Sequence, residues 1–158
     1  YKKYHTDNRR PPAWKTLEVA SLGNISKLYG NLLPSVKSKY TIAAELGTVN
    51  HTFFPSWLQS ITQIRNICAH HGRLWNKNLP GRPKLMPKPP GTWLKDVPAA
   101  SEHYMLCVHL CCMKYLLNYV HQENHFTLKL KDLLSRYPNI DLKALGMKPN
   151  WDSEPLWQ

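Results

Sequence analysis

The chain has 158 residues, of which 42% are hydrophobic, and a formal net charge of +11. This length and composition fit one folded domain and exclude a chain that is disordered throughout. The excess of 21 Lys and Arg over 10 Asp and Glu favours nucleic acid as a partner over an anionic membrane surface, the alternative being a basic protein with no polyanionic partner.

The N-terminal residues 1–12 are polar and basic and end in two prolines, which predicts an extended lead-in. Because the chain begins with Tyr1 and not with methionine, we expect it to be the C-terminal portion of a longer protein, in intramolecular contact with the missing region. No apolar run is long enough to span a bilayer, and no signal-peptide pattern is present. We therefore predict a cytoplasmic protein without a membrane partner.

The first half of the chain predicts three helices. Apolar residues recur at helical spacing over residues 13–33, and Pro34 ends this first helix. Ser35 is the predicted cap of a shorter helix that runs to about Leu46. Gly47 then fits the left-handed position that commonly follows a helix end.

The third predicted helix starts near Thr52, has Pro55 in its first turn, where a missing N–H does no harm, and ends at Gly72. Its predicted core face consists of Trp57, Leu58, Ile61, Ile64 and Cys68. Trp14 of the first helix is also expected in the core, and Trp75 is expected to anchor the segment after the third helix. Stacking on nucleic-acid bases is the alternative role for these tryptophans.

Residues 73–98 are rich in proline and glycine and predict a long irregular crossing between helices. Crossings of this length in compact domains tend to be functional or mobile. This one carries four basic side chains, namely Lys77, Arg82, Lys84 and Lys88. It is therefore a candidate RNA-binding arm, while a solvated surface loop would explain the same composition.

The second half of the chain completes an all-α bundle. Residues 99–122 are apolar on most sides, which predicts the central helix of a bundle. Residues 127–137 predict a shorter last helix, and residues 138–158 carry enough Leu, Met and Trp to predict a tail that packs on it. The expected domain is thus a bundle of four to five helices over residues 13–137, with one long Pro-rich loop.

Three of the four cysteines lie close together in the predicted central helix, at Cys107, Cys111 and Cys112. With His103 and His109 they are candidate metal ligands. Structural zinc sites, however, use Cys pairs on turns together with a second pair elsewhere in the chain. We therefore predict reduced core thiols, with neither a metal nor another cofactor.

The dodecamer of residues 65–76 reads Arg-Asn-Ile-Cys-Ala-His-His-Gly-Arg-Leu-Trp-Asn. RNA is cleaved when its 2′-hydroxyl attacks the adjacent phosphate, which requires a base, an acid and positive charge. His70 can serve as base or acid, and Arg65 can hold the phosphate through two hydrogen bonds. Asn66 lies one helical turn before His70, and its amide can orient the imidazole or contact the sugar. The alternative is a helix end at which the dipole merely favours basic side chains.

Arg65 and His70 are five residues apart, which separates them by about 140° around an ideal helix. They reach one phosphate only if the helix end bends or if a second subunit completes the site. A two-fold dimer would bring two such arginines and two such histidines around one scissile bond. We therefore favour a homodimer.

The spacing of Arg65, Asn66 and His70 resembles the Arg-polar-x(3–5)-His signature of the HEPN superfamily. The whole dodecamer is similar to that of the Abi-like (AbiD/AbiF-type) abortive-infection proteins of bacteria. The tail, from Leu145-Gly146-Met147 to Pro155-Leu156-Trp157, resembles the end of that family. On this basis the likeness runs from the third predicted helix to the C-terminus.

The resemblance implies a HEPN-like helical bundle that acts in phage defence as a metal-independent endoribonuclease, leaving 2′,3′-cyclic phosphate ends. It implies that Arg65 and His70 are catalytic and that Asn66 assists them. The residues with expected supporting roles are His71, Arg73 and Asn76. Whether His70 or its neighbour is the base stays open. HEPN nucleases usually act as dimers, in agreement with the spacing argument.

Two other functions fit the same residues. One is a non-catalytic HEPN-like module that only grips RNA, since many HEPN domains bind RNA without cutting it. The other is a protein-interaction domain whose basic surface is incidental. The first predicts salt-dependent RNA binding without cleavage products, and the second predicts no tight RNA binding at physiological salt.

Overall fold

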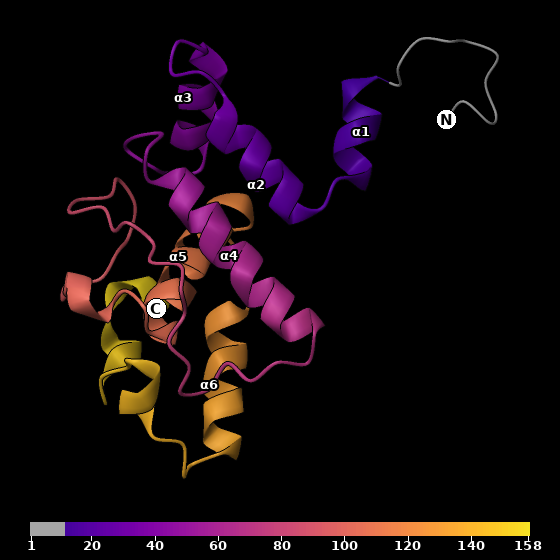
Figure 1. Ribbon diagram of the computed structural model, residues 1–158. Helices are drawn as coiled ribbons and strands as arrows, with labels where there is room; N and C mark the ends of the chain where they lie inside the picture. Colours follow the sequence, from indigo (N-terminus) through magenta and orange to yellow (C-terminus); the bar gives the residue numbers. More distant parts are fainter. Residues whose placement is uncertain (1–11) are drawn as a thin grey trace.

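The computed structural model describes residues 12–158, so the lead-in predicted for residues 1–12 lies outside the described part except for Pro12. Within that part the chain forms α-helices and short 3₁₀ turns and no strand (Figure 1). The helices are α1 (Ala13–Val19), α2 (Leu22–Asn31), α3 (Lys37–Glu45), α4 (Phe54–Ala69), α5 (Leu106–Val120) and α6 (Phe126–Arg136). The all-α prediction is confirmed. None of these helices combines the length and the apolar content that crossing a membrane requires.

The first predicted helix is in fact two helices. The backbone turns to an extended conformation at Ala20, and the Ser21 side chain caps α2 by accepting a hydrogen bond from Asn24 N over 3.2 Å. The helix α1 extends away from the other helices and buries none of its residues (Figure 1). Trp14 is consequently 58% exposed, so its predicted place in the core is wrong.

A buried lysine joins α2 to α3. Lys39 is 5% exposed, and its ammonium group donates hydrogen bonds to the carbonyl oxygens of Leu32 and Gly30 over 2.5 and 3.2 Å. These carbonyls belong to the C-terminal end of α2, where a positive charge is favourable. The predicted capping role of Ser35 is wrong, since Val36 occupies the cap position of α3. Gly47 adopts the predicted left-handed conformation, with φ of 69°.

The core is built around Trp57 of α4, which has no exposed surface. Its ring stacks on Trp93 at a centroid distance of 5.8 Å and meets the edge of Tyr115, from α5, at 5.5 Å. Pro55 lies in the first turn of α4 as predicted. The pairing of α4 with α5 therefore depends on an aromatic side chain supplied by the Pro-rich crossing.

The Pro-rich crossing is irregular as predicted, but it is not solvated throughout. Leu79, Pro83 and Met86 are fully buried, and the indole N–H of Trp57 donates a hydrogen bond to the carbonyl oxygen of Lys84 over 2.6 Å. This segment therefore forms one wall of the core. Its backbone is fixed against α4 while its charged side chains stay outside.

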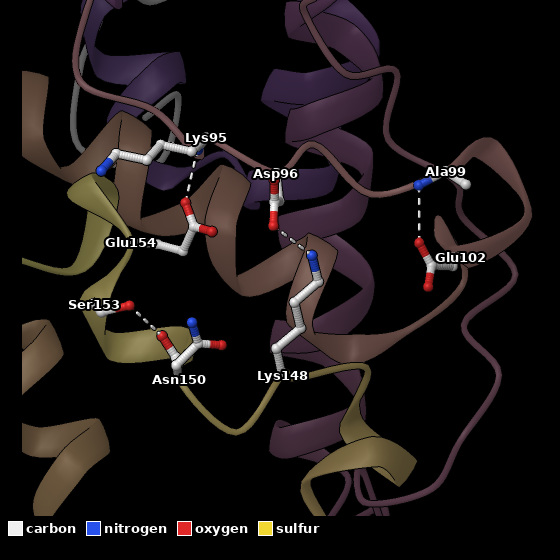
Figure 2. Close-up of polar contacts among 8 residues, drawn as sticks. All are labelled: Lys95, Asp96, Ala99, Glu102, Lys148, Asn150, Ser153 and Glu154. Carbon is white, nitrogen blue, oxygen red and sulfur yellow. Dashed lines mark hydrogen bonds and ion pairs between the residues drawn. The ribbon is translucent and has the colours of Figure 1, made fainter.

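The end of the crossing is tied to the C-terminal tail by two polar contacts. Glu154 Oε2 accepts a hydrogen bond from Lys95 N over 2.7 Å, and the Lys148 ammonium nitrogen lies 2.9 Å from Asp96 Oδ2 (Figure 2). Farther along the tail, Trp157 meets the edge of Trp151 and stacks on Phe126 of α6. The tail thus closes the core from the side opposite α4.

The central helix α5 is buried on most sides, as its composition predicts, but it begins at Leu106 and not near Ala99. A 3₁₀ turn at Ala100–Glu102 takes up the preceding residues. The cysteines of this helix are free thiols inside the core, in agreement with the prediction for Cys107, Cys111 and Cys112.

Candidate functional site

The candidate motif lies at the C-terminal end of α4. Arg65 and Asn66 are exposed on its last turn, and His70 is the C-cap residue. The helix ends there because His71 N donates to the carbonyl oxygen of Cys68 over 3.0 Å and Gly72 N donates to that of Ile67 over 2.7 Å. This pair of reversed hydrogen bonds is a Schellman motif, which satisfies the last helical carbonyls. Accordingly α4 stops at Ala69, earlier than the predicted end at Gly72.

Cys68, on the last turn of α4, differs from its predicted environment. That residue was predicted on the core face, but it is exposed. Ile67, one residue earlier, is the last side chain of α4 that packs against the core. Its thiol is therefore a surface group next to the motif, and not part of the core.

A hydrogen bond within the motif fixes the direction of the Arg65 side chain. Arg65 Nη1 donates to Asn66 Oδ1 over 3.0 Å, so the guanidinium is held on the side of the helix that carries the amide. The amide lies one turn before His70, whose backbone N–H donates to the Asn66 carbonyl oxygen. The structure thus joins Arg65 to Asn66 by their side chains and Asn66 to His70 by their backbones. We did not predict this contact, because the expected partner of Asn66 was the imidazole.

Backbone strain is concentrated in the dodecamer. Among residues 12–158, positive φ at a residue other than glycine occurs at His71 (53°) and Asn76 (48°). L-amino acids avoid this region because the Cβ approaches the carbonyl oxygen, at a cost of about 1–2 kcal/mol. Sparsely populated backbone conformations persist mainly at functional sites. Two of the residues predicted to support the site are therefore held in unusual conformations.

The left-handed position of His71 leads to a stability prediction. Because glycine accepts positive φ without this cost, His71→Gly is expected to raise the free energy of unfolding by about 0.5–1 kcal/mol, measured by urea denaturation. His70, with φ of −97°, is the matched control, and His70→Gly should lower the stability. An equal loss in both variants would mean that the left-handed turn at His71 carries no strain.

The sequence around the site is free of carboxylates. Residues 46–95 contain neither Asp nor Glu, but they contain seven Lys and Arg. These seven are Arg65, Arg73, Lys77, Arg82, Lys84, Lys88 and Lys95. A surface of this kind attracts phosphate groups over a distance of about 10 Å at ordinary ionic strength. The net charge of the chain does not show that residues 46–95 carry basic side chains without any carboxylate.

The four basic residues predicted to bind RNA are all exposed, at Lys77, Arg82, Lys84 and Lys88. None of them forms an ion pair with a carboxylate of the described residues. The structure thus presents them to solvent from a fixed backbone. Arg73 is exposed as well and follows the Schellman motif directly.

Two apolar residues anchor the segment that follows the motif. Leu74 and Trp75 line a groove of about 440 Å³ together with side chains of α5, α6 and the tail. Trp75 remains 40% exposed, in agreement with a role as an anchor at the protein surface. Leu74 packs against the core between the strained residues His71 and Asn76.

A serine–histidine pair that we did not predict lies in the core between α4 and α5. Ser60 Oγ and His109 Nδ1 are 2.5 Å apart, and neither residue has exposed surface. Burial lowers the pKa of His109 from 6.5 to about 4. The pair is sealed from solvent and cannot meet a substrate, so we assign it to the core. Within residues 12–158 no group of His, Cys, Asp or Glu side chains is arranged to hold a metal ion.

A family model described as Abi-like protein matches residues 1–76. Residues 1–76 are therefore similar to that family over slightly less than half of the chain. The Abi-like segment ends at Asn76, the last residue of the dodecamer, and therefore includes every predicted catalytic residue. It also reaches back to Tyr1, beyond the likeness that we placed from the third helix onwards, and the likeness of the tail stays a prediction. No curated protein and no solved structure matches the chain.

Proposed function

We propose that this chain is the RNA-cleaving domain of an abortive-infection protein, a HEPN-type endoribonuclease whose active centre is Arg65, Asn66 and His70. The observation that supports it most is the hydrogen bond from Arg65 to Asn66, one turn from His70, on an exposed helix end. The match of an Abi-like family model to the segment that contains these residues supports the same proposal.

The proposed reaction is a transesterification within the RNA strand. The imidazole of His70 takes the proton of the 2′-hydroxyl, whose oxygen then forms a bond to the adjacent phosphorus. The bond from phosphorus to the 5′-oxygen breaks, and that oxygen receives a proton from a second imidazolium. Arg65 stabilises the added negative charge on the phosphate through its fork of donors. The products are a 2′,3′-cyclic phosphate and a 5′-hydroxyl.

The reaction needs two proton-transfer groups, whereas one chain supplies one His70. A homodimer related by a two-fold axis supplies a second copy with the same geometry, so that one His70 acts as base and the other as acid. The exposure of Arg65 and His70 in the single chain fits this arrangement, because both side chains are accessible to a partner subunit. The left-handed turn at His71, the residue that follows His70, would then fix the backbone of His70.

Incubating the protein with RNA in the presence of EDTA tests this proposal. We expect products that end in a 2′,3′-cyclic phosphate, and we expect Arg65→Ala to lower the rate by about 10²–10³-fold, as the loss of a transition-state donor does. Lys95→Ala, which removes a cation that lies outside the motif, is the matched control.

An unchanged cleavage rate in Arg65→Ala would contradict the assignment of the active centre. RNA binding that weakens in Arg65→Ala without any product, even at high protein concentration, would instead identify a non-catalytic RNA-binding module. Absence of RNA binding at physiological salt would leave a protein-interaction domain.

A further inference from the structure

A groove of about 400 Å³ with several polar side chains in its lining lies between α2 and α4, outside the motif. The two helices lie side by side along its length (Figure 1). Its polar lining consists of Ser26, Lys27, Asn31, Gln59, Thr62 and Gln63. Helices that pack only to form a core bury apolar side chains at their contact. An open groove lined by amides and hydroxyls therefore calls for another explanation.

The groove leads directly to the motif. Gln59, Gln63, Asn66 and His70 follow one another at spacings of four, three and four residues along α4 and its cap. At 100° per residue these positions fall within about 60° of the helix surface. They form one polar stripe, of which the first two members line the groove and the last two belong to the proposed active centre. A ligand that runs along this stripe passes from the groove to His70.

One amide of the stripe is held in place before any ligand binds. Gln63 Oε1 accepts a hydrogen bond from Gly81 N over 2.9 Å, which ties the Pro-rich crossing to the edge of the groove. A Cβ at residue 81 would lie 2.4 Å from that same oxygen, so any other residue there would displace the Gln63 amide from its present position. The orientation of the Gln63 amide is therefore set by the fold, as expected for a group that recognises a ligand.

The charge of the groove favours a polyanion over a protein helix. Between residues 19 and 95 the sequence contains one carboxylate, Glu45, and that residue does not line the groove, whereas Lys27 does. An apolar protein surface would leave the amides and hydroxyls without partners, which is costly. Bases and 2′-hydroxyls of an unpaired RNA strand offer both donors and acceptors to such groups. A duplex would instead require a row of cations along its phosphates.

We infer that the groove between α2 and α4 binds the single-stranded RNA that flanks the scissile phosphate. This inference rests on the proposed function and adds a second contact region to it. Amide and hydroxyl groups of the groove hydrogen-bond to bases and sugars, Lys27 neutralises a phosphate, and the strand continues over Asn66 to His70.

Gly30 allows the groove to be filled without disturbing the fold. It lies in α2 and lines the groove, and a Cβ added there would meet no atom within 4 Å. Leucine and alanine are both better helix formers than glycine, so neither Gly30→Leu nor Gly30→Ala should lower the stability. The leucine side chain occupies the groove, whereas alanine adds a single methyl group and serves as the matched control.

The test measures the binding of a fluorescent ten-nucleotide single-stranded RNA of randomised sequence by anisotropy. Gly30→Leu is expected to weaken binding about tenfold or more, since blocking the groove removes hydrogen bonds to the RNA. Gly30→Ala should bind within about twofold of the unmodified chain, because it leaves the groove open. A dinucleotide, which reaches only the motif, should be cleaved at the same rate by both variants.

The outcomes separate this inference from the proposed function. If Arg65→Ala loses RNA cleavage while Gly30→Leu binds and cleaves RNA as the unmodified chain does, the groove inference is wrong and the proposed function stands. If the unmodified chain binds no RNA at all, both fail. Equally tight binding of a duplex of the same length, with equal loss in Gly30→Leu, would contradict the single-strand specificity.

Discussion

Replacement of His70 by alanine is expected to reduce RNA cleavage by at least about 10³-fold, because in the proposed dimer it removes the general base and the general acid together. Replacement of His71 by glycine should change the rate by less than about threefold, since glycine keeps the left-handed backbone and removes only the imidazole. The measurement is the initial rate of cleavage of a fluorescent RNA at saturating protein. The two variants differ at adjacent residues, and each serves as the control for the other.

The pH dependence of the same assay adds a second readout. One imidazole that acts as base and one that acts as acid predict a bell-shaped dependence of the cleavage rate on pH. In a mixed dimer with one His70→Ala subunit, the cleavage rate should lose its fall on one side of the pH optimum. The opposite pattern, with activity lost in His71→Gly and kept in His70→Ala, would assign the base to His71.

Acidification from pH 7 to pH 4 is expected to lower the free energy of unfolding by about 3 kcal/mol through His109 alone. Burial lowers the pKa of this histidine from 6.5 to about 4 in the folded chain. Well above pH 6.5 the His109 ring carries no extra proton in either the folded or the unfolded chain. The full contribution of this ring to the free energy of unfolding is then present. Between pH 6.5 and 4 the unfolded chain takes up a proton that the folded chain excludes. Stability therefore falls through this window, and urea denaturation at a series of pH values measures it.

The double variant Ser60→Ala with His109→Met should flatten this part of the pH profile, because it removes both members of the buried pair. His121→Asn, at an exposed histidine, should leave the profile unchanged. NMR titration of the His109 ring in the folded chain gives an independent value. Titration near pH 6.5, or a profile that is the same in the double variant, would contradict the assignment of acid lability to this pair.

The helices were predictable where apolar periodicity coincides with a clear stop. The helix α6 lies within one residue of its predicted bounds, and Pro55 marks the first turn of α4 correctly. The break at Ala20 was not predictable, because the apolar residues keep helical phase across it while Ser21 supplies a cap. The start of α5 was placed too early, since a 3₁₀ turn and a helix share the same local composition.

The site was predictable as a set of residues but not as a geometry. The spacing of Arg65 and His70 indicates a gap around the helix, but not that the flexible arginine side chain hydrogen-bonds to Asn66. Gly72 was the natural choice for the left-handed turn, yet His71 adopts it, because the hydrogen bonds to Ile67 and Cys68 determine where the helix ends. The position of a partner subunit could not be predicted, because one sequence does not determine how two copies of a chain meet.

The stacking of Trp57 on Trp93 has a consequence for how the protein is divided. The Abi-like segment ends at Asn76, so Trp57 lies inside it while both of its aromatic neighbours, Trp93 and Tyr115, lie after it. The segment that matches the family model is therefore smaller than the core that it helps to build. A fragment cut at Asn76 would keep the whole motif but expose the most deeply buried indole of the core.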